Sequence, residues 1–300
     1  MPLNEFTLTR RDFIKGAGCA AVGVVVGLPV LAEEIAKPAA VKSRVILIRN
    51  QGVVGSDGKI NADLVQQMLD EAMVALFQKE KPLDCWRQII KPSDVVGVKT
   101  NRWRNLPTPP EVELAILRRV SETGVPPEQV AIDDQGVLGN AVFKRTTALI
   151  NTRPMRTHAW AGVGSLTKNY IMFAENPPDY HDDACAGLAK LWDLPMVKGK
   201  TRLNVLVMLT PQFHTMGPHH FDRAYVWSYN GLIVSTDPVA ADSVGLRIIQ
   251  QKRKLAFGEE RPLQPNAHHI ALADTQYRLG NSDMKNIDLV RLGWDGDILI

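Results

Sequence analysis

Residues 204–220 read NVLVMLTPQFHTMGPHH, and residues 230–245, after a short connector, read NGLIVSTDPVAADSVG. Each stretch contains a run of apolar, mostly branched residues, which is typical of a strand buried on both faces. We therefore expect strands over 204–209 and 231–234. Buried strands of this kind predict an α/β protein, in which a mostly parallel sheet is flanked by helices.

Both expected strands lead into polar residues. A loop with His214, His219 and His220 follows the first strand, and Asp237-Pro238 follows the second. Asp237 is a suitable N-cap residue, and proline is favoured in the first turn of a helix. Ligands usually bind at the carboxyl ends of the strands in open α/β sheets. We therefore expect the histidine loop and the helix start to meet at one edge of the sheet.

The rest of the chain alternates between predicted strands and helices. Further strands are expected at 44–49, 94–99, 129–132, 153–160 and 287–292. Helices are expected at 61–78, 82–90, 109–123, 141–150, 182–192, 238–254 and 267–279. Residues 94–134 form a strand–helix–strand unit, so the polar residues that end its strands should share one sheet edge. These residues are Lys99, Asn101, Asp133 and Asp134.

The N-terminal residues have the pattern of an export signal. Arg10-Arg11 precedes a Gly- and Ala-rich apolar run, and Ala32 ends a small-residue cleavage site. Residues 1–32 therefore resemble a twin-arginine (Tat) signal peptide, and a membrane anchor is the alternative. Residues 33–42 would be a linker and 43–300 the folded α/β domain, as one unit or as two lobes divided near residue 150. This predicts a protein of the periplasm or cell envelope without a membrane span in its mature chain.

Composition narrows the functional classes. A net charge of +3 over 300 residues is too weak to indicate nucleic-acid binding, so no nucleic-acid partner is expected. Beyond the signal region the cysteines are Cys85 and Cys185, and no C-x-x-C pattern occurs. The chain therefore lacks the cysteines to hold its own iron–sulfur cluster.

Three segments in order resemble the DUF362 family, a domain of unknown function that is sometimes fused to iron–sulfur modules. They are DVVGVKTN at 94–101, SLTKN at 165–169 and STDPVAADSVG at 235–245. The ferredoxin-type cysteine repeats of some members are absent from this chain. The resemblance implies motif positions without an assigned role for Lys99, Asn101, Lys168, Asn169, Asp237 and Asp242.

The candidate site residues allow alternative chemistries. His214, His219 and His220 could ligate a transition metal, line a polar pocket or lie in a plain surface loop. Lys99 could anchor an anion, or it could form a salt bridge with Asp133 or Asp134. Lys168 and Asn169 could likewise bind a ligand, or they could make only structural contacts within the protein. Asp237 is either a helix cap or a ligand, and Asp242 faces either the site or solvent.

Three functions remain open. The first is an exported protein associated with a metal or redox cofactor, because the Tat route often carries proteins that are loaded with a cofactor before export. The second is a cofactor-free enzyme that acts on a small anionic molecule, with Lys99 binding charge and His214 as acid or base. The third is a non-catalytic partner subunit of a periplasmic redox complex.

Overall fold

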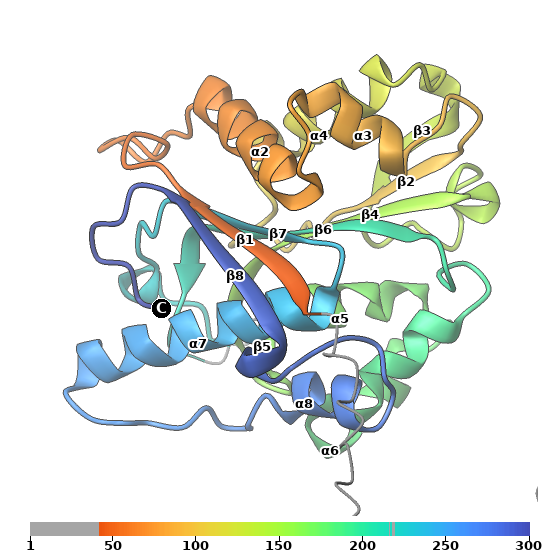
Figure 1. The fold of residues 1–300 in the computed structure, drawn as a ribbon. Coiled ribbons are helices and arrows are strands. Elements are labelled where there is room, and N and C mark those ends of the chain that lie inside the picture. The colour runs from red at the N-terminus through yellow and green to blue at the C-terminus, as the bar shows by residue number, and fades with distance from the viewer. Residues whose placement is uncertain (1–41, 216, 218–219) are drawn as a thin grey trace, which may run out of the picture. The chain divides into compact units, whose positions relative to one another are not determined.

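The computed structural model describes residues 42–300 except 216, 218 and 219, and these described residues form a mixed eight-stranded sheet with helices on both faces (Figure 1). The strand order is β3-β2-β4-β6-β7-β1-β8, and β5 pairs with β4. The pairs β3–β2, β2–β4, β4–β6 and β1–β8 are parallel. The predicted α/β class with a mostly parallel sheet is confirmed. The strands are β1 (Ser43–Arg49), β2 (Val96–Lys99), β3 (Val130–Asp133), β4 (Ala148–His158), β5 (Gly162–Gly164), β6 (Thr201–Gln212), β7 (Gly231–Ser235) and β8 (Ile287–Gly293).

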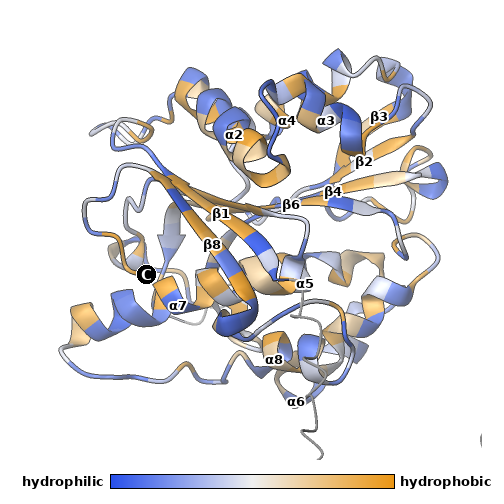
Figure 2. Cartoon of the chain, in the orientation of Figure 1, coloured by the Kyte–Doolittle hydropathy of each residue, from blue (hydrophilic) through white to orange (hydrophobic). Residues whose placement is uncertain are grey.

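Helices cover the two faces of this sheet. One face carries α2 (Ala62–Phe77), α3 (Pro82–Ile89) and α4 (Pro110–Glu122), and the other carries α5 (Leu166–Asn169), α6 (Asp182–Cys185), α7 (Pro238–Phe257) and α8 (His268–Thr275). Figure 2 shows hydrophobic residues concentrated in the strands and on the helix faces turned toward them. Burial of these faces against the sheet is the main favourable contribution to the fold.

The helix starts follow the sequence signals. The Asn61 side chain accepts a hydrogen bond from the Leu64 amide at the start of α2, and Asp237 accepts from the amides of Val239 and Ala240 at the start of α7. Both caps satisfy amides that have no partner within the helix. Helix α7 ends at Gly258, which has a φ of 72°, a conformation that glycine adopts without strain.

Strand β7 corrects one prediction. It runs antiparallel to both β6 and β1. The described part of the connector between β6 and β7 contains a short 3-10 turn and no α-helix, whereas a parallel pair requires a long crossover, usually helical. The carboxyl end of β7, with Asp237, therefore lies at the opposite edge of the sheet from the carboxyl end of β6, with His214. The expected meeting of the histidine loop and the α7 start does not occur.

Two predicted helices are also wrong. Residues 141–150 contain only a 3-10 turn at Phe143–Arg145 before β4 begins, and every residue of β4 is buried. The central position in the sheet overrides the helical propensity of alanine and leucine there. Residues 182–192 form the short α6 and a 3-10 segment, with positive φ at Asp183, Ala184 and Cys185.

The domain boundaries remain partly predictions. The signal peptide and most of the linker, 1–41, lie outside the described residues. The described residues group as one compact unit, and residue 150, the suggested boundary between two lobes, lies inside the central strand β4. Within the described part of the chain, no helix has both the length and the apolar character that crossing a membrane requires.

Candidate functional site

The polar residues of β2, β3 and β4 meet at the carboxyl edge of the sheet. Lys99 at the end of β2 is paired in register with Asp133 of β3, and β4 and β6 run parallel to them. A cavity of about 120 Å³ opens at this edge, and we call it the basic pocket. Its lining residues are Asn101, Trp103, Asp134, Gln135, Arg153, Arg156, His158, Lys168, Asn169, Ile171 and Met172.

Lys99 does not line the pocket but binds two residues that do, Asp134 and Asn169. Its ammonium group donates to Asp134 Oδ1 at 2.6 Å, to the Thr100 carbonyl at 2.7 Å and to Asn169 Oδ1 at 3.4 Å. Burial lowers the Lys99 pKa to about 8, and the Asp134 carboxylate opposes this shift. An ammonium group has three protons to donate, and all three have acceptors here. Lys99 therefore holds Asp134 and Asn169 in place. Of the two aspartates considered from the sequence as its salt-bridge partner, Asp134 is the one that Lys99 contacts.

Arg153 and Arg156 bring two further charges into the pocket from β4. Residues three apart on a regular strand point to opposite faces, but the pairing of β4 with β6 shifts register between Pro154 and Arg156. Both arginines line the pocket, and each is 3% exposed. This irregularity therefore places two guanidinium groups beside each other.

These two guanidinium groups are incompletely paired. Arg153 donates to the Ser165 carbonyl at 3.2 Å, and Arg156 donates to Asn101 Oδ1 at 3.0 Å. The buried Nε atoms of both have no hydrogen-bond partner among the described residues. Burial lowers the Arg153 pKa to about 10. Burial and then the charge of Arg153 lower the Arg156 pKa well below its usual value. The Asp134 carboxylate attracts both groups but is itself paired with Lys99, so the pocket contains buried positive charge that is only partly compensated.

Lys168 adds a third cation. Its ammonium group lies 3.4 Å from the Cys185 thiol, and burial lowers its pKa to about 8. Asn169, the next residue, donates to the Lys99 carbonyl, to Asn151 Oδ1 and to the Thr152 carbonyl. The adjacent motif residues thus differ: Lys168 lines the pocket with its charge, and Asn169 ties α5 to β2 and β4.

Asp242 of α7 positions α5 through hydrogen bonds. It is fully buried on α7 and accepts hydrogen bonds from the Leu166 and Thr167 amides, each at 2.8 Å, and from Thr167 Oγ1 at 2.7 Å. Burial raises its pKa to about 6, against the effect of these hydrogen bonds. Asp242 thus faces neither the pocket nor solvent, the two positions considered from sequence. It fixes the start of α5, the helix that carries Lys168 and Asn169.

His158, also in β4, is a buried lining residue of the pocket. Its Nδ1 accepts a hydrogen bond from the Trp160 amide at 3.2 Å, so the proton of the neutral ring is on Nε2. Burial, followed by the charges of Lys168, Arg153 and Arg156, lowers the His158 pKa strongly. The ring is therefore neutral across the physiological range and can donate a hydrogen bond from Nε2.

His214 and His220 line a second hollow beside the basic pocket. This hollow, of about 610 Å³, also has His158 in its wall, and we call it the histidine hollow. Arg253 Nη1 lies 3.1 Å from His214 Nδ1, and burial and the Arg253 charge lower the His214 pKa. His219 lies outside the described residues. Among the residues that the structure describes, no group of three or more His, Cys, Asp or Glu side chains is placed to hold a metal ion.

Two other predicted site residues, Asp133 and Asp237, do not line the pocket. Asp133 accepts hydrogen bonds from the Asp134 and Gly136 amides and from Asn140, so it shapes the turn after β3. Asp237 caps α7 at the opposite sheet edge, where it also accepts from Ser43. Both residues organise local backbone.

The position of Asp237 leads to a testable prediction. We expect Asp237→Ala to lower the free energy of unfolding by about 1–2 kcal/mol, the usual effect of losing an N-cap. Anion binding at the basic pocket should stay within about twofold of wild type, because the cap lies at the other edge of the sheet. Urea unfolding and sulfate titration measure the two effects. A loss of sulfate binding in a folded Asp237→Ala protein would contradict this placement.

Arg153, Arg156 and His158 were not identified as site residues from the sequence. The signal was present in NTRPMRTH, because charged residues inside a buried strand are rare unless they have a role. The strand expected at 153–160 contained all three residues, but a regular strand would place Arg153 and Arg156 on opposite faces. Hydropathy alone gave no reason to place both arginines in one cavity.

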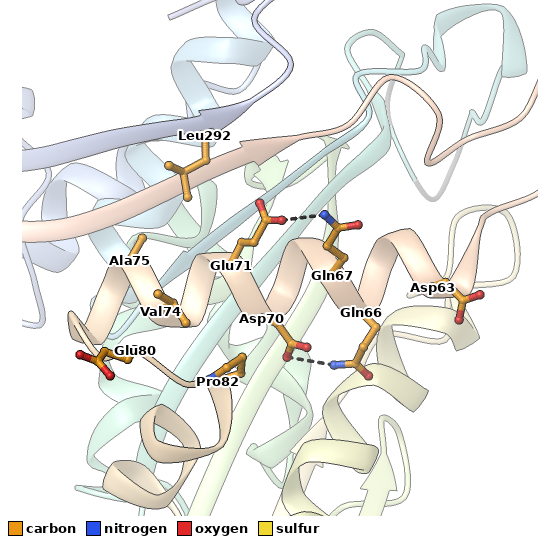
Figure 3. Close-up of a pocket in the computed structure, with 10 residues that line it drawn as sticks. All are labelled: Asp63, Gln66, Gln67, Asp70, Glu71, Val74, Ala75, Glu80, Pro82 and Leu292. Atoms are coloured by element: carbon orange, nitrogen blue, oxygen red, sulfur yellow. Dashed lines mark hydrogen bonds between the residues drawn. The ribbon is translucent and has the colours of Figure 1, made fainter.

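A hollow of about 670 Å³ along α2 is larger but lacks this chemistry (Figure 3). Acidic and apolar side chains line it, and its central polar groups bind one another. Gln66 donates to Asp70 at 3.1 Å, and Gln67 donates to Glu71 at 2.7 Å. Asp70 is also paired with Arg119. Because its inner carboxylates are partnered within the protein, we do not regard this hollow as the functional site.

The site is therefore a small, positively charged pocket at the carboxyl edge of an α/β sheet. No family model, curated protein or solved structure matches this chain. Membership of the DUF362 family thus stays a prediction from the three sequence segments.

Proposed function

We propose that this protein is an enzyme that acts on a small anionic molecule bound in the basic pocket. One observation carries the proposal. Arg153, Arg156 and Lys168 line a single small cavity, and Asp134 is the one carboxylate among its described lining residues. Buried charge without a partner is costly, so a bound anion would supply the missing countercharge. Clustered titratable groups with perturbed pKa values are also typical of active sites.

The residues divide into distinct roles in this proposal. The arginines bind the oxygens of the anion, because guanidinium groups match oxyanions in geometry and keep their charge. Lys168, with a pKa of about 8, can hold or transfer a proton near neutral pH. Lys99 acts as a positioning residue, since its three donors are engaged. His214 is not part of the basic pocket, so the acid–base role first considered for it passes to Lys168.

Binding of sulfate should depend on the charge of Lys168. A protonated lysine attracts the anion, so we expect affinity to fall as pH rises through about 8, the folded-state pKa of Lys168. Sulfate stays a dianion over this range, so any change in affinity comes from the ionisation of protein groups. Isothermal titration between pH 6.5 and 9.5 measures the effect.

Lys168→Met should bind sulfate about 10-fold more weakly at pH 7, as expected for one charged contact, and lose part of the pH dependence, because Lys99 also has a pKa of about 8. Lys190→Met, an exposed lysine on the following segment, is the matched control and should behave as wild type. If wild type binds neither sulfate nor phosphate at millimolar concentration, the proposed function is wrong.

We also propose that the enzyme acts outside the cytoplasm, on the support of the paired arginines, apolar run and cleavage site in residues 1–32. Cell fractionation of the full chain tests this, with Arg10→Lys/Arg11→Lys as the variant expected to stay in the cytoplasm. A metal- or redox-associated role, alone or with a redox partner protein, stays a prediction. Metal analysis of the purified mature protein tests it.

A further inference from the structure

The size of the basic pocket limits what can fit inside it. Its volume of about 120 Å³ is well below the about 300–1,000 Å³ of usual small-molecule sites. The neighbouring histidine hollow, at about 610 Å³, falls within that range. His158 belongs to the wall of both. The basic pocket and the histidine hollow therefore adjoin at His158.

The chemistry of the histidine hollow favours a polar occupant. Most of the side chains that line it carry hydrogen-bonding groups, including Thr157, His214, Arg261 and Gln264. Its wall is held by Arg253, which donates to the carbonyls of Phe213, Arg261 and Pro262. These carbonyls are therefore occupied, while hydroxyl, imidazole and amide groups along the wall can bind hydroxyl groups of a ligand.

The charge of the basic pocket favours a doubly charged group. Its three cations face one lining carboxylate, Asp134, which Lys99 already neutralises. Two guanidinium groups and one ammonium group line the pocket, and together they offer more donors than the two oxygens of a carboxylate can accept. A phosphate group has more acceptor oxygens and two negative charges.

We propose that the ligand is an organic phosphate with a hydroxylated body. Its phosphate group binds to Arg153, Arg156 and Lys168 in the basic pocket, and its body lies in the histidine hollow. The neutral His158 ring donates from Nε2 to an oxygen at the junction. This inference rests on the proposed function and specifies its substrate class.

The test compares ligands that share the phosphate group and differ in the body. Isothermal titration is performed with inorganic phosphate, glycerol 3-phosphate, ribose 5-phosphate and glucose 6-phosphate, and with gluconate as a hydroxylated carboxylate. We expect at least one organic phosphate to bind about 10-fold or more tightly than inorganic phosphate, because its body adds contacts. Gluconate should bind more weakly than inorganic phosphate.

A variant that fills the second space isolates the role of the body. Gln264→Trp adds a large side chain to the histidine hollow at an exposed position, and Gln250→Trp on the exposed side of α7 is the control. We expect Gln264→Trp to bind the organic phosphate no more tightly than inorganic phosphate. Its affinity for inorganic phosphate should change less than about twofold. The control should retain both affinities.

The outcomes separate the two proposals. If inorganic phosphate binds but no organic phosphate binds more tightly, or if Gln264→Trp leaves the gain intact, the substrate class is wrong and the anion site stands. Tighter binding of gluconate than of inorganic phosphate would also overturn the phosphate assignment. If neither phosphate nor sulfate binds, the proposed function itself fails.

Discussion

Asp134→Ala is expected to lower the free energy of unfolding by about 3–5 kcal/mol, the usual cost of removing one partner from a buried ion pair. Lys99 is fully buried, and its contact with Asp134 Oδ1 at 2.6 Å is its charge-neutralising interaction. The substitution leaves a buried ammonium group with only the Thr100 carbonyl and Asn169 Oδ1 as acceptors. It also removes the acceptor of the Arg102 amide. Urea unfolding at pH 7 measures the change.

If Asp134→Ala does not fold, a double variant still tests the Lys99–Asp134 ion pair. Lys99→Met combined with Asp134→Leu removes both charges, so we expect a smaller loss of stability than in Asp134→Ala. Glu128→Ala, at an exposed acidic residue before β3, should stay within about 0.5 kcal/mol of wild type. A loss below about 1 kcal/mol in Asp134→Ala would show that Lys99 does not depend on this carboxylate.

Arg156→Met should have opposite effects on stability and binding. The Arg156 guanidinium is buried, donates a hydrogen bond to Asn101 and makes a cation–π contact with Trp103, 4.5 Å from the ring centroid. Burial and the charge of Arg153 lower its pKa, which means that its charged form is destabilised in the folded protein. Replacing it with methionine, which is apolar and of similar length, should raise the free energy of unfolding by about 1–4 kcal/mol.

The same substitution should weaken sulfate binding about 10- to 100-fold, because a charge-assisted hydrogen bond to the anion is lost. Thermal unfolding without and with sulfate measures both effects in one experiment. Arg145→Met, at an exposed arginine just before β4, is the control and should change neither. Lower stability together with unchanged sulfate binding would mean that Arg156 is a structural residue. Active sites commonly retain such destabilising groups because function requires them.

The basic pocket was partly predictable from sequence. Lys99, Asn101 and Asp134 were expected at one sheet edge because a strand–helix–strand unit brings parallel strand ends together, and β2 and β3 are parallel as expected. Asp237 was placed wrongly, because sequence does not report strand direction. The amino-acid composition of β7 is compatible with either direction, parallel or antiparallel, relative to its neighbour β6.

The sequence by itself determined the α/β class, most of the strands and the caps of α2 and α7, because hydrophobic runs and capping residues act over a few neighbouring positions. Tertiary structure alone decided that Arg153 and Arg156 share a cavity with Lys168 and that Asp242 is buried behind them. These positions depend on the register of β4 against β6 and on the packing of α5 against α7. Contacts between residues far apart in the chain set both, and no local pattern encodes them.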